Sequence, residues 1–275
     1  MPRRVWARVT DTTVFNFSGI GVAEAYERYF VPRIFRPWAE VMLDALDVGE
    51  GEALLDIACG PGTVTKAAAA RTGDMGVVVG TDISPEMVEV ARATTPASAR
   101  VRYEVASSDA LPFADHEFDA IACQQGIQFF PDRAAAIAEM HRVLRPGGRA
   151  GLAAWSSIDD APFFAVARTV IGRAVPEVAQ MLDRPILDRE TLQRELEAGG
   201  FAVNVTAVSL PLEFENGIEQ AIEAMRGLPM WPTVAAQPPK VRTAILESAR
   251  ESFSRYLHHG RVRMSMRANV AVARR

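Results

Sequence analysis

The stretch that decides the fold is Ala53-Leu54-Leu55-Asp56-Ile57-Ala58-Cys59-Gly60-Pro61-Gly62-Thr63-Val64-Thr65. Its apolar start, residues 53–58, predicts a strand buried on both faces, as in a central parallel sheet. A Gly-Pro-Gly turn ends the strand, and residues 63–71 have helical composition. Glycines let the backbone approach a ligand, and free N–H groups at a helix start favour negative charge. The stretch therefore predicts a nucleotide-type binding loop.

A second buried strand, Val77 to Asp82, ends in an acid twenty residues after Gly62. A carboxylate at that position accepts hydrogen bonds from both hydroxyls of a ribose. The dinucleotide fingerprint requires a glycine or alanine where this chain has Thr65. Asp56, just before the loop, would repel a pyrophosphate but suits a ligand that carries an ammonium and a sulfonium. These details favour S-adenosylmethionine over NAD.

Residues 56–62 resemble the first motif of the class I S-adenosylmethionine-dependent methyltransferases, and Asp82 resembles their ribose-binding acid. Three further motifs resemble the family in the same order: Ser108-Asp109-Ala110-Leu111-Pro112-Phe113, then Phe118-Asp119-Ala120-Ile121 to Gln128-Phe129-Phe130, then Arg142-Val143-Leu144-Arg145-Pro146-Gly147-Gly148. The resemblance covers roughly residues 50–155. It is to the small-molecule methyltransferases that include the ubiquinone/menaquinone-biosynthesis type. Ala58 departs from the pattern, because many members carry a glycine there.

Alternating strand and helix patterns from about Glu52 to Trp155 are typical of a parallel sheet with right-handed crossovers. With the resemblance, they predict an α/β fold: a Rossmann-like, seven-stranded, mostly parallel sheet with helices on both faces. We expect an N-terminal arm and helical cap at 1–48, a cofactor-binding core at 49–210 and the last core strand at 261–275. Residues 211–260 form a long insertion before that strand, and we expect a helical lid there because such insertions usually serve a function.

The cofactor site is expected at the carboxyl ends of the strands, where open α/β sheets bind ligands. Backbone carbonyls near Gln124 are expected to bind an ammonium group there. The resemblance adds Met87 as a residue that packs on the adenine, with core packing as its alternative, and Asp109 as an acceptor for the adenine amine, with a plain turn as its alternative. The residues expected to bind S-adenosyl-L-methionine, and its product S-adenosyl-L-homocysteine, are Tyr29, Asp56, Ala58, Cys59, Gly60, Gly62, Thr63, Asp82, Ile83, Met87, Ser108, Asp109, Ala110, Gln124, Gln125 and Gly126.

The methyl acceptor is expected to meet a largely apolar and aromatic lining. Gln125 and Gln128 are amides, which are poor bases, so we assign them positioning roles only. An ordinary core role remains the alternative for Trp38. The residues expected to contact the acceptor are Phe17, Tyr26, Trp38, Gln128, Phe129, Trp155, Met230 and Trp231. This lining predicts a small acceptor that is apolar or aromatic.

Methyl transfer from a sulfonium is an in-line displacement at an activated carbon. Holding donor and acceptor in line in a dry pocket supplies about 7–11 kcal/mol, and a base is needed only for some acceptors. No catalytic residue is therefore assigned, and the histidines and cysteines lack the spacing of metal ligands. A protein that binds S-adenosylmethionine without methylating is the alternative from another class. An NAD-dependent oxidoreductase is disfavoured by Thr65 and Asp56.

Charge and composition narrow the range of partners. The 275 residues include 30 basic and 34 acidic side chains, a net charge of −4 that offers no basic footprint for nucleic acid or an anionic membrane. The sequence contains no stretch of about 18 apolar residues and no charged-then-apolar leader. Two cysteines at the ends of predicted strands are expected to be buried thiols. We therefore expect a cytoplasmic protein with a small-molecule partner.

Overall fold

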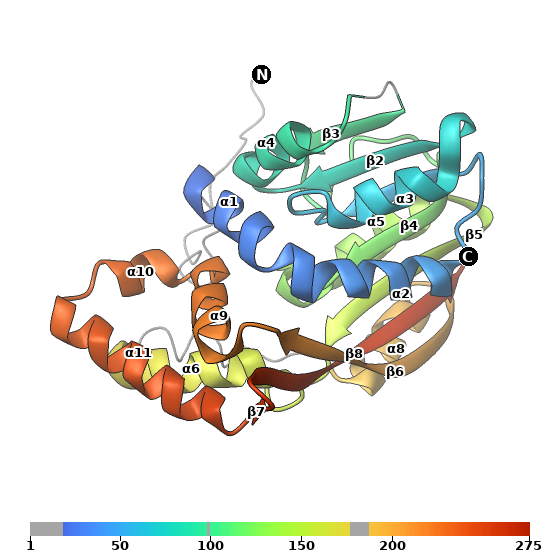
Figure 1. Cartoon of the computed structure of the whole chain (residues 1–275). Helices are drawn as coiled ribbons and strands as arrows, with labels where there is room; N and C mark the ends of the chain where they lie inside the picture. The colour runs from blue at the N-terminus through green and yellow to red at the C-terminus, as the bar shows by residue number, and fades with distance from the viewer. Residues whose placement is uncertain (1–18, 98–99, 177–186) are drawn as a thin grey trace, which may run out of the picture.

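The structure is a computed structural model that describes residues 19–97, 100–176 and 187–275. Its centre is one sheet of eight strands in the order β3-β2-β1-β4-β5-β8-β6, with β7 paired to β8 (Figure 1). Phe17, expected in the acceptor site, lies outside the described residues. The strands are β1 Ala53–Ile57, β2 Val77–Asp82, β3 Val101–Val105, β4 Phe118–Gln124, β5 Leu144–Trp155, β6 Ala202–Phe214, β7 Leu257–His258 and β8 Arg261–Arg274.

The prediction of a mostly parallel sheet is confirmed, with one correction to its strand count. Strands β1 to β5 run parallel, and β8 lies antiparallel between β5 and β6. The expected seven strands are all present. The eighth, β7, has two residues and pairs with the start of β8 through Leu257↔Val262 and His258↔Arg261. Two residues are too few to show an alternating pattern in the sequence.

Helices cover both faces of the sheet, as predicted (Figure 1). Alternate residues of β1 face opposite sides, so Leu54 joins the apolar cluster beneath α2 and α3 while Leu55 joins the one beneath α5 and α8. The helices are α1 Ile20–Tyr29, α2 Arg36–Leu46, α3 Thr63–Thr72, α4 Pro85–Thr94, α5 Arg133–Val143, α6 Pro162–Ala174, α8 Arg189–Ala198, α9 Gly217–Ala224, α10 Trp231–Ala235 and α11 Pro239–Ser254.

Several helices begin where their capping residues predict. Ser84 Oγ accepts a hydrogen bond from Met87 N at 3.2 Å at the start of α4, and Pro85 occupies the first turn. Asp132 Oδ1 accepts from Ala135 N at 2.9 Å at the start of α5. At the N-terminus, a π-helical turn, Val31–Phe35, contains Pro32 and connects α1 to α2.

The insertion before the last strand starts later than expected. Strand β6 continues past Leu210 and through Pro211 to Phe214, paired along its whole length with β8. Proline is tolerated here because β6 is an edge strand with a single neighbour in the sheet. The inserted segment therefore spans residues 215–260 and carries α9, a 3₁₀ turn at Met225–Gly227, α10, α11 and β7.

This inserted segment shares its apolar core with the rest of the chain. The Phe253 ring of α11 stacks at 5.9 Å from that of Phe163 in α6, which lies 5.7 Å from Phe214. At Gly227, an added Cβ would lie 2.8 Å from Cδ1 of Phe30, so the 3₁₀ turn packs directly on the end of α1. Helix α1 lies between α4 and the inserted segment (Figure 1). The segment and the cap therefore form one packed unit with the core.

Phe253→Ala is expected to lower the free energy of unfolding by about 3–5 kcal/mol, because the fully buried ring leaves a cavity in this shared core. Denaturant unfolding followed by circular dichroism measures the loss, and the transition should remain single. Glu251→Ala, an exposed change on the same helix, is the control. A separate early transition for the segment would contradict the shared core.

Candidate active site

The loop after β1 has a left-handed backbone at three positions. Ala58, Gly60 and Gly62 have φ of 56°, 53° and 83°. Glycine adopts this conformation without strain, whereas an L-residue such as Ala58 pays about 1–2 kcal/mol. Backbone bonds tie the loop to β2, because Cys59 N donates to Thr81 O at 2.9 Å. The loop is thus held in a fixed, open turn at the carboxyl end of the sheet.

Tyr103 of β3 lies beneath this loop, and it was not among the residues singled out from the sequence. Its side chain is buried and its hydroxyl lies 2.7 Å from Thr95 Oγ1. A Cβ added to Gly62 would collide with that hydroxyl, and one added to Gly80 would lie 2.6 Å from Tyr103 Cδ1. The two glycines are therefore needed for space as well as for backbone freedom. Only the spatial neighbourhood of β2 and β3 reveals this role.

Gly62→Ala is expected to destabilise the protein by about 2–4 kcal/mol, from the left-handed φ together with overpacking against Tyr103. The double variant Gly62→Ala/Tyr103→Phe should recover part of the loss, since it removes the colliding hydroxyl. Thermal and denaturant unfolding of both variants, with Tyr103→Phe alone as the control, gives the coupling free energy. Strict additivity of the two substitutions would show that the collision does not matter.

Asp82 ends β2 and links the loop to the next helix. Its Oδ2 accepts from Gly60 N at 2.8 Å and its Oδ1 from Ser84 N at 2.9 Å. Burial raises the pKa of Asp82, while these backbone donors act in the opposite direction. Each carboxylate oxygen has a second lone pair, so both remain able to accept from a ligand hydroxyl.

Asp56 is the most buried acid of this site, with 1% of its surface exposed. Its Oδ2 accepts from Thr65 N at 2.9 Å and from Thr65 Oγ1 at 2.6 Å. Its Oδ1 is buried without a hydrogen-bond partner among the described residues. Burial raises the pKa of Asp56 to about 7, against the two Thr65 bonds. An unpaired buried carboxylate oxygen marks a place where a cationic ligand group fits.

This shift predicts a pH dependence of stability. Between about pH 4 and pH 7 the folded state keeps the Asp56 proton that the unfolded state has lost, so stability falls as the pH rises through this range. A shift from 3.8 to about 7 corresponds to a loss on the order of 4 kcal/mol. In denaturant titrations at pH 4.5 to 8, the stability of the wild type relative to Asp56→Asn should decline accordingly. A pH-independent difference would exclude this titration.

The N-terminal cap reaches the site through α1. The Tyr26 ring stacks on Phe35 at 4.8 Å, and burial together with the charge of Asp82 raises its pKa. An ion pair of 3.0 Å joins Glu27 of α1 to Lys66 of α3. Tyr29, on the same helix, is half-buried against the large apolar cluster. Tyr26 thus lies close enough to Asp82 to respond to its charge, while the expected contacts of Tyr26 with the acceptor and of Tyr29 with the cofactor stay predictions.

The expected adenine side lies at the carboxyl ends of β2 and β3. Ile83 and Val105 are 60% and 50% exposed there, which is unusual for such large apolar side chains. Met87, in contrast, is buried against Ala23 and Val90, and its expected contact with the adenine stays a prediction. Val105 was not among the expected site residues.

Residues 108–113 form a loop that α5 holds in place. Arg142 donates to the carbonyls of Phe113 at 2.8 Å and Leu111 at 3.1 Å, and Glu139 Oε2 accepts from Leu111 N at 2.8 Å. Asp109 is exposed and accepts a hydrogen bond from Ser107 Oγ. Glu139 had no assigned role in the sequence, and Arg142 was noted only as the first residue of a motif that resembles the family.

The apolar residues expected around the acceptor fall into two groups. Trp38, Trp155 and Met230 are buried in one cluster with part of the inserted segment, and the rings of Trp38 and Trp155 meet edge to face at 5.6 Å. Trp231 packs on this cluster while half-buried, and Phe129 is 38% exposed. The first group is packed as core, and the second group has surface left for a ligand.

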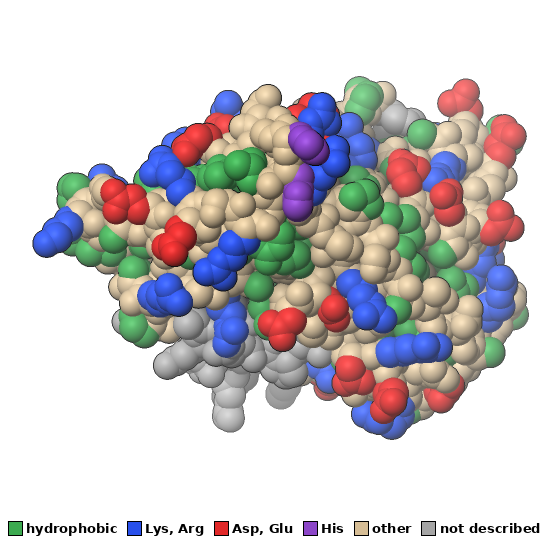
Figure 2. All heavy atoms as spheres, turned by 60° about the horizontal axis from the view of Figure 1, so that its bottom comes forward, with side chains coloured by type: hydrophobic (Ala, Val, Ile, Leu, Met, Phe, Trp, Pro, Cys, Tyr) green, Lys and Arg blue, Asp and Glu red, His purple; other side chains and the backbone are tan. Residues whose placement is uncertain are grey.

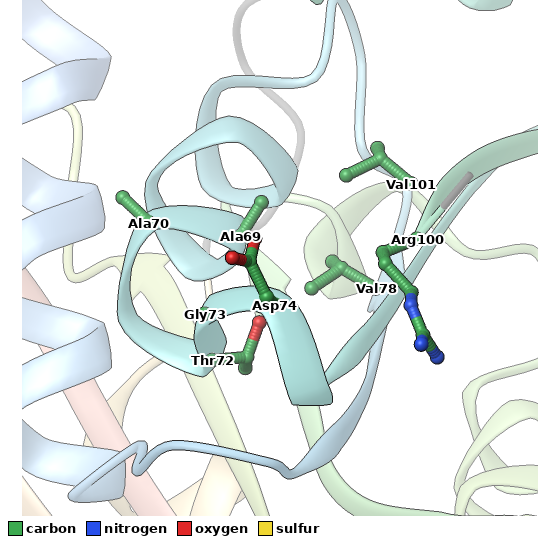
Figure 3. Close-up of a pocket in the computed structure, with 8 residues that line it drawn as sticks. All are labelled: Ala69, Ala70, Thr72, Gly73, Asp74, Val78, Arg100 and Val101. Carbon is green, nitrogen blue, oxygen red and sulfur yellow. The ribbon is translucent and has the colours of Figure 1, made fainter. Parts of the chain in front are cut away.

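A cavity of about 270 Å³ lies elsewhere, between the end of α3 and the starts of β2 and β3 (Figure 3). Thr72, Asp74, Val78 and Arg100 are among its lining residues. These belong to the amino ends of the strands, whereas Asp56, Asp82 and the glycine loop lie at the carboxyl ends. The cavity is therefore separate from the candidate active site.

Three further observations concern the described residues as a whole. Cys59 and Cys123 are buried free thiols, as expected. Among residues 19–97, 100–176 and 187–275, no cluster of histidine, cysteine and acidic side chains could hold a metal ion. No helix in that same part of the chain combines the length and apolarity needed to cross a bilayer.

The sheet order, the glycine loop and the acid at the end of β2 define a class I, Rossmann-like methyltransferase fold. The residues also fit its cofactor: Asp56 Oδ1 suits a cation, Asp82 a ribose, and exposed Ile83 an adenine face. A family model described as a methyltransferase domain matches residues 55–152. Residues 55–152 thus carry a methyltransferase domain of the class I, S-adenosylmethionine-dependent type, which includes the ubiquinone/menaquinone C-methyltransferases, and S-adenosylmethionine is the cofactor of that family.

Curated relatives match in the same region. The "Uncharacterized 37.1 kDa protein in transposon TN4556" of Streptomyces fradiae is 36% identical over 196 residues, 70% of this chain and 55% of that protein. The ubiquinone/menaquinone biosynthesis C-methyltransferase UbiE of Geotalea uraniireducens is 38% identical over 127 residues, 45% of this chain and 54% of that protein. The chain thus spans about half the length of these relatives.

Solved structures share the fold at low identity. The YcgJ protein of Bacillus subtilis superposes with a TM-score of 0.57 and 20% identity, covering 86% of this chain and 97% of that one. Phosphoethanolamine N-methyltransferase 2 of Haemonchus contortus was solved with phosphomonomethylethanolamine and S-adenosylhomocysteine. It superposes with a TM-score of 0.59 and 18% identity, covering 96% of this chain and 58% of that one. Both agree with the predicted Rossmann-like architecture.

Proposed function

We propose that the protein transfers a methyl group from S-adenosylmethionine to a small, apolar or aromatic metabolite. The observation that carries the proposal is the pair of acids at the carboxyl ends of β1 and β2, Asp56 with an unpaired buried oxygen and Asp82 bonded to the glycine loop. When bound, S-adenosylmethionine supplies a methyl group on a positively charged sulfur.

The chain's own residues would act by binding and positioning. Asp82 accepts from the ribose hydroxyls, Asp56 offers a negative charge to the cationic end of the ligand, and Ile83 provides an apolar face for the adenine. The remaining expected contacts are the loop from Ala58 to Thr63 with Cys59, Gly60 and Gly62, the Ser108–Ala110 turn, the Gln124–Gly126 backbone, and Tyr29 from the cap. Charged side chains that are already in position in a dry site do not have to rearrange during the reaction.

We further propose that the acceptor lies between the cap, the end of β4 and the inserted segment. Tyr26, Phe129 and Trp231 are the aromatic side chains there with exposed surface. Residues 1–48 would act as the cap, the expected core of 49–210 with the rest of β6 to Phe214 as the cofactor-binding part, the inserted segment 215–260 as the lid, and 261–275 as the strand that completes the sheet. Because the lid is packed into the core, it would shape the acceptor site as a wall.

A metabolite fits the surface better than a nucleic acid does. The face in Figure 2 carries interspersed basic and acidic side chains with apolar patches between them, and no continuous basic stripe. The net charge is −4. Two buried free thiols suit the reducing environment of the cytoplasm, which we propose as the location.

Asp82→Ala is expected to weaken binding of S-adenosylmethionine and S-adenosylhomocysteine at least tenfold. Each lost charge-assisted hydrogen bond to the ribose is worth about 1.5–3 kcal/mol. Isothermal titration calorimetry of the folded variant measures the change, and Asp74→Ala, an exposed acid beside the cavity of Figure 3, is the matched control. Unchanged affinity in a folded Asp82→Ala protein would refute the site.

Turnover against a metabolite panel separates catalysis from mere binding. A protein that binds both ligands but transfers no methyl group to any acceptor would be a non-catalytic S-adenosylmethionine-binding protein. Titration with NAD provides the negative control, since the Asp56 carboxylate, which Thr65 holds at the helix start, would repel a pyrophosphate.

A further inference from the structure

The two carboxylate oxygens of the buried Asp56 have very different surroundings. Oδ2 accepts two hydrogen bonds from Thr65, one from its backbone N–H at 2.9 Å and one from its hydroxyl at 2.6 Å. Oδ1 has no hydrogen-bond partner among the described residues. Lys66, the next residue of α3, pairs with Glu27 of the cap at 3.0 Å. An ionised Asp56 would therefore be a buried charge that is compensated on one oxygen only.

Among the described residues, the titratable groups that face Asp56 are neutral or negative. They are the Asp82 carboxylate from β2, the Tyr103 phenol from β3, the Cys59 thiol from the glycine loop and the Cys123 thiol from β4. Burial raises the pKa of both thiols and of the phenol, so these three groups are neutral at physiological pH. Asp82 adds a negative charge. A buried acid in such surroundings takes up a proton, because the alternative is an uncompensated charge.

We propose that a proton and the cationic end of S-adenosylmethionine compete for Asp56, and that Thr65 is the positioning residue that sets the pH of this competition. A ligand cation at Oδ1 compensates the charge, so cofactor binding releases the proton to solvent. The Thr65 hydroxyl favours the ionised form, because its hydrogen bond lowers the pKa of Asp56 against the larger effect of burial. This inference rests on the proposed methyltransferase function.

Cofactor affinity is therefore expected to fall as the pH falls. Burial raises the pKa of Asp56 to about 7, so the free protein holds this proton at pH 6 and has mostly lost it at pH 8. Between these two pH values, the affinity of the wild type for S-adenosylmethionine should fall about tenfold. Calorimetry in buffers with different heats of ionisation counts the protons, and about one should be released per cofactor bound at pH 6. A binding enthalpy at pH 6 that is the same in every buffer would overturn the proposal.

Asp56→Asn identifies the group that titrates. The amide stays neutral, so this variant should bind S-adenosylmethionine more weakly than the wild type at pH 8. Its affinity should change less than about twofold between pH 8 and pH 6, because no proton is left to compete. Asp82 is still present in this variant. A tenfold fall that persists in Asp56→Asn would assign the proton to another group and would contradict the proposal.

Thr65→Val tests the positioning role, because it keeps the shape of the side chain and removes the hydroxyl donor. The midpoint of the affinity curve should move upward by about one pH unit, which is the size expected for one hydrogen bond to a charged group. Thr65→Ser keeps the hydroxyl and should restore the wild-type midpoint. Thr169→Val is the matched control, since the Thr169 hydroxyl donates to Ala165 O at 2.9 Å on the exposed side of α6.

Circular dichroism establishes that each variant is folded, and Thr65→Ala replaces Thr65→Val if the latter is not. A variant without the hydroxyl that loses affinity equally at every pH would mean that Thr65 only holds the loop, and its positioning role would be refuted.

The outcomes also separate this inference from the proposed function. If the folded wild type binds S-adenosylmethionine with equal affinity at pH 6 and pH 8, the competition with a proton is refuted while the proposed function stands. If it binds S-adenosylmethionine at neither pH, the proposed function itself fails.

Discussion

The site depends on the buried contact between Asp56 and Thr65, which joins the end of β1 to the first turn of α3. One carboxylate oxygen takes both the backbone N–H and the hydroxyl of Thr65, so the loop between them has to close into a short, left-handed path. Its other oxygen has no hydrogen-bond partner among the described residues and almost no contact with solvent. A charge in such a place is unfavourable unless a cation pairs with it.

Asp82 is the second acid that fixes the glycine loop. By accepting from Gly60 and from Ser84, it joins the glycine loop to the start of α4, and it does so at the strand adjacent to β1. Tyr103 then fills the space under both glycines. The ligand-facing side of the loop is therefore shaped by residues from three neighbouring strands. Rigidity of this kind is what positioning by binding alone requires.

Much of this arrangement was predictable from the sequence, for physical reasons. The strand, loop and helix around Asp56 carry local signals of apolar runs, glycines and caps, and these do not depend on distant residues. Tyr103, Arg142 and Glu139 escaped prediction because their roles come from contacts across strands and loops. The extension of β6 through Pro211 escaped because proline usually ends a strand, and only the edge position makes it acceptable. The left-handed backbone of Ala58 was not predicted; the sequence showed only that Ala58 stands where many family members have a glycine.

The hairpin of β6 and β8 has a further consequence for how this chain diversifies. Both stems of the inserted segment meet where Gly217 lies against the carbonyl of Gly260, and both residues have a left-handed backbone. Because β6 and β8 pair from Ala202↔Arg274 to Phe214↔Val262, this register does not by itself fix the length of the connection between their ends. The aromatic stack through Phe163 and Phe253 restricts that freedom. A connection recruited from another protein would have to supply a ring at that depth to keep this core filled.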